Sequence, residues 1–463
     1  MEEKQNRAVL LLVVLAQFMV AFMTTALFVS VPDIEQSYRV QVDQVCWIEI
    51  GYSLTLAAFC VPFGKISDLM GRRKMMLLGL IAFGAISFMC MYAYTMQLLI
   101  IFRAVQGVTA AMVLSGANAF LADAYPAEKR RSALGISVSA TFVGMIVGPA
   151  AGQYLSNYVS WQSVFLTTAI LAAVALLICV IGPEPDEARR CGSSSDSGGF
   201  VLLVLGIAVT LLSLSLLPNI TATLIMMAVG AAILACFIYK ERHTDDPMVR
   251  PGLISDRISI LANSGALLCY AASCALSCLI GAYLRNINHA GSGGLSAALI
   301  WFCLGAAMFA PVAGKLADRH PLNRMSTIAM ILSMVSCVMC FFLTKTPSVL
   351  YVSVLLLLAG AGSGIFIPVI TGAVFSRAGA EENGVVNAIL NTYYVFGQAV
   401  SMVILSAAFT RHITYVYDVK ATGSRLITVI RIAAGVLIAI YGAAAFLSLM
   451  REQLESKESQ KAA

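Results

Sequence analysis

The sequence predicts an all-α integral membrane protein in which fourteen membrane-spanning helices form two six-helix bundles and a linking pair. Two observations carry this prediction. Of the 463 residues, 59% are hydrophobic and only 12% are charged, whereas soluble domains are roughly 45–50% apolar and 25% charged. Apolar runs of about 20 residues, each long enough to cross a bilayer core of about 30 Å, also recur along the whole chain.

Each apolar run is expected to form one helix. The predicted spans are 8–31, 45–64, 75–95, 97–122, 132–156, 162–182, 200–217, 219–239, 258–283, 294–314, 325–343, 348–373, 384–410 and 426–450. The first run is too long for the apolar part of a signal peptide and has no small-residue cleavage site. We therefore interpret it as the first helix, retained in the protein.

The distribution of Lys and Arg predicts that both termini are cytoplasmic. With the N-terminus inside, 22 of the 30 basic residues fall in cytoplasmic segments and six in the opposite loops. Cytoplasmic loops of membrane proteins carry such an excess, so the pattern favours an even number of spans. The net charge of +6 then reflects topology, and we expect no nucleic-acid partner.

Two segments have the composition of linkers. Residues 183–199 and 240–257 are rich in Pro, Gly, Ser and charged side chains, which is typical of linkers. The predicted domains are a bundle over 1–182, linkers with helices 7 and 8 over 183–257, a bundle over 258–450 and a cytoplasmic tail over 451–463.

An internal repeat supports this division. Gly64-Lys65 and Asp68 return 250 residues later as Gly314-Lys315 and Asp318. Gly107 and Gly360 lie 253 residues apart, and so do Gly144 and Gly397. Transporters are often built from such repeats, with the substrate site near the membrane midplane between them.

Patterns typical of enzymes and metal centres are missing from the sequence. The 12 cysteines lie mostly inside apolar runs without ligand spacing, where Cys acts as a small hydrophobe. All four histidines lie in predicted loops, and neither a nucleophile motif nor a phosphate-binding glycine loop occurs. We therefore expect no metal, no cofactor and no enzymatic activity.

Gly64–Lys74 is a charged stretch that we predict to be a short turn between the second and third helices. Its two glycines, Gly64 and Gly71, allow close backbone approach or positive φ. Asp68 and the basic residues Arg72 and Arg73 can pair with one another or with helix ends. From these residues alone, a cytoplasmic anchor and a functional cluster are equally good interpretations.

Arg103 lies within the predicted fourth helix, three residues before Gln106. An arginine inside a bilayer costs about 2.5–3.5 kcal/mol, so it needs a partner or a wet cavity. At 1.5 Å per residue it lies about 9 Å from the outer end of the helix. Snorkelling to the outer interface remains the alternative, although Gln106 on the same helix face favours a functional position.

Two other helices carry unusual stripes. In the fifth helix Gly144, Gly148 and Gly152 recur every four residues, with Gly135 on the opposite side and Pro149 able to kink the helix. In the thirteenth helix the spacing of four, three and four places amide and phenol groups on one face, formed by Asn387, Asn391, Tyr394 and Gln398. The alternatives are ordinary helix packing for the glycines and interhelical hydrogen bonding for the polar stripe.

A polar face on an apolar helix should turn inward in a membrane. We therefore treat the stripe as part of a substrate cavity. Further candidates for the cavity are Gln17, Thr24, Thr25, Gln106 and Asn118. Amides, phenols and methionines suit neutral or amphipathic organic molecules.

The chain resembles the major facilitator superfamily. Gly64–Lys74 looks like the signature of its loop between helices 2 and 3, and Leu99, Arg103, Gln106 and Gly107 resemble its helix 4 motif. The glycine stripe of the fifth helix is similar to its antiporter motif. Trp47, Tyr52 and Pro62 resemble the fourteen-helix drug:proton antiporter branch, in which helices 7 and 8 are the extra pair.

The resemblance implies roles for individual residues. The loop aspartate, here Asp68, would pair with Arg72 and with a carboxylate after helix 4, here Asp123, and latch one conformation. The expected latch consists of Gly64, Asp68, Gly71, Arg72, Arg73, Asp123, Asp318 and Arg319. Arg103 would take part in proton coupling, and the helix 5 motif would mark an exporter.

The sequence departs from this pattern at the usual proton site. Met23 stands where the branch usually has an aspartate in helix 1. Glu49, near the outer end of the second helix, and Asp33, after the first, are the remaining candidates for proton coupling beside Arg103. If Glu49 faces Arg103, the two can exchange partners as protons come and go; the alternative is that both acids are solvated at the outer interface.

We predict a secondary active transporter that exports small organic or amphipathic compounds in exchange for protons, by alternating access. The alternative is an importer, facilitator or lipid or metabolite translocase on the same scaffold without proton antiport. The expected partners are a small organic substrate, protons and membrane lipid. We expect a monomer that spans the cytoplasmic membrane of a bacterium many times.

Overall fold

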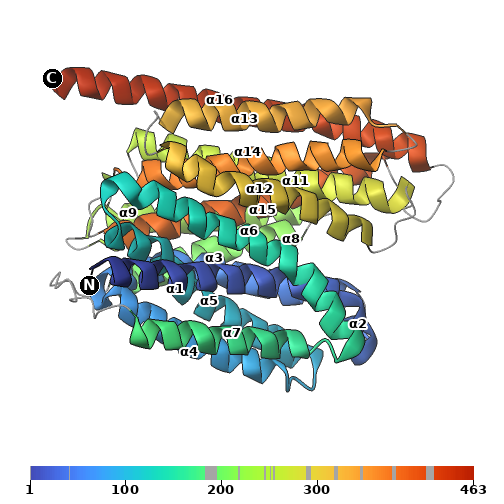
Figure 1. Cartoon of the computed structure of the whole chain (residues 1–463), viewed down its shortest axis with the longest axis horizontal. Coiled ribbons are helices and arrows are strands. Elements are labelled where there is room, and N and C mark those ends of the chain that lie inside the picture. Colours follow the sequence, from blue (N-terminus) through green and yellow to red (C-terminus); the bar gives the residue numbers. More distant parts are fainter. Residues whose placement is uncertain are drawn as a thin grey trace. The chain divides into compact units, whose positions relative to one another are not determined.

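In the computed structural model the described part of the chain is built from helices (Figure 1). The residues that it describes are 2–40, 42–182, 196–216, 219–244, 247–250, 252–253, 256–287, 293–317, 322–344, 348–377, 382–412 and 422–462. They form two units. Unit 1 comprises residues 1–255 and 375–392, and unit 2 comprises residues 256–374 and 393–463.

Nine of the described helices belong to unit 1. They are α1 (Glu2–Val29), α2 (Val31–Tyr38), α3 (Val42–Met70), α4 (Arg72–Cys90), α5 (Met96–Ala124), α6 (Ala127–Tyr158), α7 (Ser163–Ile181), α8 (Ser197–Ser215) and α9 (Ile220–Glu241). Within this unit α1 packs against α6, α3 against α5, and α8 against α9.

Unit 2 is built from the later helices. They are α11 (Arg257–Ile287), α12 (Gly293–Ala317), α13 (Leu322–Met339), the short 3-10 helix η1 (Cys340–Phe342), α14 (Val349–Phe375) and α16 (Thr422–Ala462). Helix α15 (Asn383–His412) is shared, because its first ten residues belong to unit 1 and the remainder to unit 2.

The predicted number of spans is confirmed. Fourteen of the described helices are long and apolar enough to cross a membrane. Two features differ from the prediction. The chain after the first span forms the separate short helix α2, and α16 continues to Ala462, well beyond the predicted end at residue 450.

The predicted turn at Gly64–Lys74 is wrong. Helix α3 continues through the charged residues to Met70, and α4 begins at Arg72. Gly71 alone stands between the two helices, with a φ of 95° that L side chains rarely adopt. One glycine is therefore enough to change the chain direction, and Asp68 gains a fixed position on a helix.

The internal repeat reappears in the way glycines pack within each unit. In unit 1 Gly107 of α5 packs directly on the carbonyl of Tyr52, and in unit 2 Gly360 of α14 packs on the carbonyl of Phe302. The glycines lie 253 residues apart and their partners 250 residues apart. The same close approach therefore recurs in both halves of the sequence.

A second pair of glycine contacts recurs at a similar offset, with the glycines 253 residues apart and their partners 249 residues apart. A Cβ on Gly144 would lie 2.5 Å from the carbonyl oxygen of Phe18, and one on Gly397 would lie 2.7 Å from that of Leu267. Such distances leave no room for a side chain. Each unit therefore repeats the helix contacts that the sequence repeat predicts.

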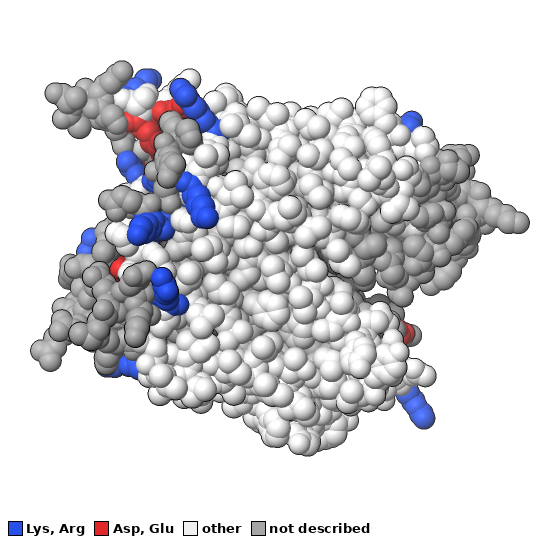
Figure 2. All heavy atoms as spheres, in the orientation of Figure 1, with Lys and Arg blue, Asp and Glu red and all other residues white. Residues whose placement is uncertain are grey.

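The surface fits a membrane environment. On the face drawn in Figure 2 the described residues present mostly uncharged atoms, and the Lys and Arg side chains in view lie toward the ends of the helices. Exposed apolar residues such as Ile101, Ile170 and Leu177 are 56%, 56% and 59% accessible. An apolar lateral surface is what a bilayer requires.

Candidate functional site

The first polar centre joins α3, α4 and α5 in unit 1. Arg72 Nη2 lies 3.2 Å from Asp68 Oδ1, and Arg72 Nη1 pairs with Asp123 and donates to the Ala119 carbonyl at 2.8 Å. The side chain of Arg72 is 5% exposed and that of Asp68 is 6% exposed. The pairing that the resemblance implied is therefore present. We call Asp68, Arg72 and Asp123 the Asp68 cluster.

The Asp68 cluster also holds the first turn of α15. The Asp68 carboxylate accepts the backbone N–H of Gly384 at 2.9 Å and that of Val385 at 3.1 Å. The Asn383 side chain donates to Asp123 Oδ1 at 3.1 Å. A carboxylate at a helix N-terminus satisfies orphan N–H groups and meets the positive end of the helix dipole. No local sequence signal revealed this partner, because Asp68 and Gly384 are more than 300 residues apart.

Close packing supports the same contact. A Cβ on Gly64 would lie 2.6 Å from the Gly384 carbonyl, and one on Gly384 would lie 2.5 Å from Asp68 Oδ1. Arg73 donates to the Cys179 and Val180 carbonyls at the end of α7. Asp318 and Arg319 of the predicted second copy lie outside the described residues.

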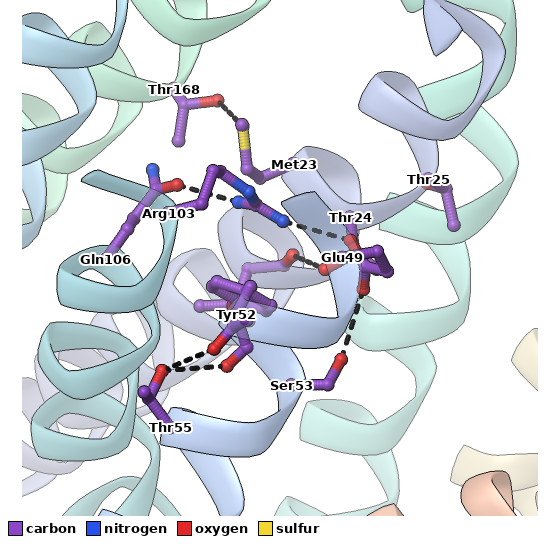
Figure 3. A network of polar contacts seen from close by, with 12 residues as sticks. Met23, Thr24, Thr25, Glu49, Tyr52, Ser53, Thr55, Arg103, Gln106 and Thr168 are labelled. Carbon is purple, nitrogen blue, oxygen red and sulfur yellow. Dashed lines mark hydrogen bonds and ion pairs between the residues drawn. The ribbon is translucent and has the colours of Figure 1, made fainter. Parts of the chain in front are cut away.

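The second polar centre surrounds Arg103, whose side chain is fully buried (Figure 3). Its Nη2 lies 2.9 Å from Glu49 Oε2, and its Nη1 donates to Gln106 Oε1 at 2.7 Å. The guanidinium carbon lies 4.1 Å from the centre of the Tyr52 ring. Arg103 does not snorkel, because it has a carboxylate, an amide and an aromatic face as partners within the protein.

Glu49 is the partly exposed member of this second centre. Its side chain is 35% exposed, and its other oxygen accepts the Ser53 hydroxyl at 3.3 Å. Gln106 is fully buried and donates to Ser87 at 2.7 Å, so it orients Arg103. We call Arg103, Glu49, Gln106 and Tyr52 the Arg103 centre.

Asp33 is not among the residues that contact Arg103. It lies in the first turn of α2 and is half-buried. Met23 is completely buried in an apolar cluster with Ile48 and Trp161, and its sulfur accepts the Thr168 hydroxyl at 3.0 Å. The position at which the resemblance expects an aspartate is therefore part of the core.

Three of the cavity candidates form one hydrogen-bond network in unit 1. Asn118 donates to Asn387 Oδ1 at 3.2 Å and accepts Gln17 Nε2 at 3.4 Å and the Ser137 hydroxyl at 3.0 Å. Asn387 in turn donates to the Ser115 carbonyl at 2.9 Å. Asn387 thus makes interhelical hydrogen bonds, which was the alternative interpretation of the polar stripe.

Of the remaining candidates, Thr24 is in contact with Tyr52 of the Arg103 centre. Thr24 and Thr25 donate to the Val20 and Ala21 carbonyls of their own helix. Asn391 and Gln398 are half-buried on α15.

Tyr394 lies in unit 2. The centre of its ring is 5.3 Å from that of Tyr270. The unit boundary therefore divides the predicted stripe, with Asn387 and Asn391 on one side and Tyr394 and Gln398 on the other.

The glycine stripe of α6 packs on α1. Gly148 would place a Cβ against the Thr25 hydroxyl and 2.9 Å from the Phe22 carbonyl, and Gly152 would place one 2.6 Å from the Ala26 carbonyl. Pro149 lies inside α6, and Gly135 is a buried residue of the same helix. The stripe thus allows two helix backbones to touch over three turns.

Among the described residues no group of three or more His, Cys, Asp or Glu side chains is arranged to hold a metal ion. Both polar centres instead pair a buried arginine with carboxylates. Together with the fourteen spans and the repeated helix packing, they define a polytopic α-helical membrane protein built from two related halves.

The chain belongs to the Major Facilitator Superfamily. The family profile matches residues 13–402 and 261–463. The protein is therefore a multi-pass membrane transporter of the kind that this family comprises.

Relatives and a solved structure agree with this membership. The chain is 24% identical to "Riboflavin transporter RibZ" of Clostridioides difficile over 89% of this chain and 90% of the relative. It is 26% identical to "Multidrug resistance protein Stp" of Mycobacterium tuberculosis over 87% and 76%. The fold is similar to that of the human organic anion transporter MFSD10, with a TM-score of 0.72, 14% identity and coverage of 96% and 99%.

Proposed function

We propose that this protein exports small organic or amphipathic compounds across the membrane in exchange for protons, by alternating access. Its relatives include proteins named for multidrug resistance. The observation that carries the proton coupling is the ion pair between Arg103, which is fully buried, and Glu49, which is 35% exposed. This pair joins a fully buried charge to an acid whose side chain is partly exposed.

Protonation of Glu49 changes what Arg103 is bound to. With Glu49 ionised, the guanidinium has a counter-ion at 2.9 Å. With Glu49 neutral, Arg103 keeps Gln106 and the Tyr52 ring, and a buried charge has lost its carboxylate partner. The two protonation states therefore favour different local arrangements, which is what coupling of protons to a conformational change requires.

The test is efflux from proteoliposomes with and without an imposed pH gradient. Riboflavin and a neutral amphipathic dye serve as probes. In the wild type we expect a pH gradient to accelerate efflux, and in Glu49→Gln we expect this acceleration to disappear, because the amide cannot exchange a proton. Asp33→Asn is the matched control, since Asp33 is an acid outside the Arg103 centre, and should keep the acceleration.

Three results would contradict the proposal. If the pH gradient did not change wild-type efflux, transport would not be coupled to protons. If a pH gradient still accelerated efflux by Glu49→Gln, Glu49 would not be the proton-coupling residue. If the acceleration were lost in Asp33→Asn alone, the proton-coupling residue would be Asp33.

The second candidate is an importer, facilitator or translocase without proton antiport. It is favoured by Met23, which is buried in an apolar cluster at the position where the resemblance leads us to expect an aspartate, and by the relative named as a riboflavin transporter. The same vesicle experiment distinguishes the two candidate functions, because this one predicts that riboflavin moves down its own gradient with no response to pH.

As further proposals, the protein acts as a monomer and both termini are cytoplasmic.

A further inference from the structure

The segment Pro247–Arg250, which follows α9, is a bound strap rather than a free linker. The side chains of Met248 and Val249 are only 5% and 2% exposed. The sequence pattern predicted a linker here, and linkers expose their side chains. We call these four residues the strap.

One side of the strap is held by the α8–α9 hairpin. Glu241, the last residue of α9, is 1% exposed and accepts the backbone N–H of Val249 through Oε2 at 3.1 Å. At the same end Lys240 pairs with Asp196, the N-cap of α8. Burial acts to raise the pKa of Asp196, but the Lys240 ammonium and the Gly199 amide hold this pKa below its ordinary value.

The other contacts of the strap reach both sides of the Asp68 cluster. Lys65 donates to the Pro247 carbonyl at 3.2 Å, and it precedes Asp68 by less than one turn of α3. Arg250 Nε lies 2.9 Å from Glu382 Oε1. Glu382 comes directly before Asn383, the residue that donates to Asp123.

We propose that the strap is a conformational brake, which ties the α8–α9 hairpin to α3 and to the first turn of α15 and slows their separation. Separation of α15 from α3 breaks the hydrogen bonds of Asp68 to Gly384 and Val385. The strap contacts Lys65 on α3 and Glu382 directly before α15. Separation of α15 from α3 therefore requires the strap to release one of these two residues. From the proposed function, this inference takes only the premise that the Asp68 contact opens during transport.

The contacts of the strap differ in strength. Arg250 is 64% exposed and Glu382 is 17% exposed, and an ion pair open to solvent contributes little. The anchor at Glu241 is buried, and moving Val249 away would leave a buried carboxylate oxygen without its partner. The strap therefore stays on the hairpin, and the Arg250–Glu382 pair is the exposed contact that the experiment below addresses.

The test is hydrogen–deuterium exchange of the full-length protein in nanodiscs, read by mass spectrometry on a peptide covering residues 383–392. The amides of Gly384 and Val385 exchange when they separate from Asp68. Arg250→Glu replaces the ion pair by two carboxylates, so we expect exchange to accelerate about three- to fivefold. Glu382→Arg alone should do the same, and the double variant Arg250→Glu/Glu382→Arg should return exchange to within about twofold of wild type.

Arg242→Glu is the matched control, since it makes the same charge change at an exposed residue beside α9, and it should leave exchange unchanged. Exchange in Arg250→Glu no faster than in Arg242→Glu would overturn the brake, and so would a double variant as fast as Arg250→Glu. Because exchange is measured without substrate or gradient, failure of the brake is distinguishable from failure of proton-coupled export.

Discussion

Two buried arginines of unit 1, Arg72 and Arg103, have their charges compensated in different ways. Arg72 is 5% exposed and has two carboxylate partners, Asp68 and Asp123. Arg103 is fully buried and has one, Glu49, whose side chain is 35% exposed. A buried arginine with two acids keeps a counter-ion if one is neutralised, whereas Arg103 does not, so the Arg103 centre is the better place for proton exchange.

The geometry of the guanidinium at Arg103 leads to a prediction. Arg103 uses two nitrogens to reach Glu49 and Gln106 and lays its plane near the Tyr52 ring. Lysine keeps the charge but has no planar fork. We expect Arg103→Lys to lower the rate of pH-driven efflux about tenfold or more, because one buried charge-assisted hydrogen bond is worth about 1.5–3 kcal/mol.

Efflux rates in proteoliposomes measure this loss, and thermal unfolding in detergent shows whether the variant is folded. The control is Arg39→Lys, a conservative change at an exposed residue after α2. Equal rates for Arg103→Lys and wild type would mean that charge alone suffices at this position.

At the scale of elements, the α1–α6 contact depends on missing side chains. Gly144, Gly148 and Gly152 each bring the backbone of α6 onto α1, and added methyl groups would meet carbonyl oxygens that cannot swing aside. We further predict from the resemblance that the two helices move along this contact during transport.

Substitution of one glycine tests the packing. In Gly144→Ala the new methyl group would lie 2.5 Å from the Phe18 carbonyl. We expect this overpacking to destabilise the protein by about 1–3 kcal/mol and to lower the midpoint of thermal unfolding in detergent. The matched control is Gly84→Ala in α4, where the nearest atom would lie at an ordinary 3.4 Å from the new Cβ; a midpoint as low in the control would assign the effect to helix glycines in general.

At the scale of the whole molecule, the internal repeat is regular in its helix packing and irregular in its charged motif. The glycine contacts recur at offsets of 249 to 253 residues. The charged motif is complete at Gly64–Lys74, whereas His320-Pro321-Leu322-Asn323 interrupts its second copy. The helix scaffold is therefore duplicated, and the charged motif that it carries is not duplicated in full.

This asymmetry predicts unequal effects of two matched substitutions. Asp68→Asn removes a charge that pairs with Arg72 and accepts two N–H groups of α15. We expect it to reduce efflux more than Asp318→Asn, which makes the same change in the interrupted copy. Initial efflux rates at equal amounts of protein in the vesicles make the comparison, and equal losses would argue against the asymmetry.

The sequence by itself determined the membrane class, the fourteen spans and the repeat, because each depends on local composition or on spacing along the chain. An apolar run of about 20 residues must cross the bilayer as a helix wherever it is placed. The residues of the Asp68 cluster came from the resemblance, and Glu49 came from a search for the few acids near membrane depth. The resemblance also implied that Asp68 pairs with Arg72 and Asp123, but neither argument gave the contact of Asp68 with α15 or the burial of these side chains.

Only the tertiary structure decided which of these residues meet. It placed Asp68 at the first turn of α15, Met23 in the apolar core, and Asn387 in an interhelical hydrogen-bond network. It also turned a segment of linker composition into a strap with buried side chains. The physical reason is that burial and hydrogen-bond partners are set by residues hundreds of positions away, which local periodicity does not record.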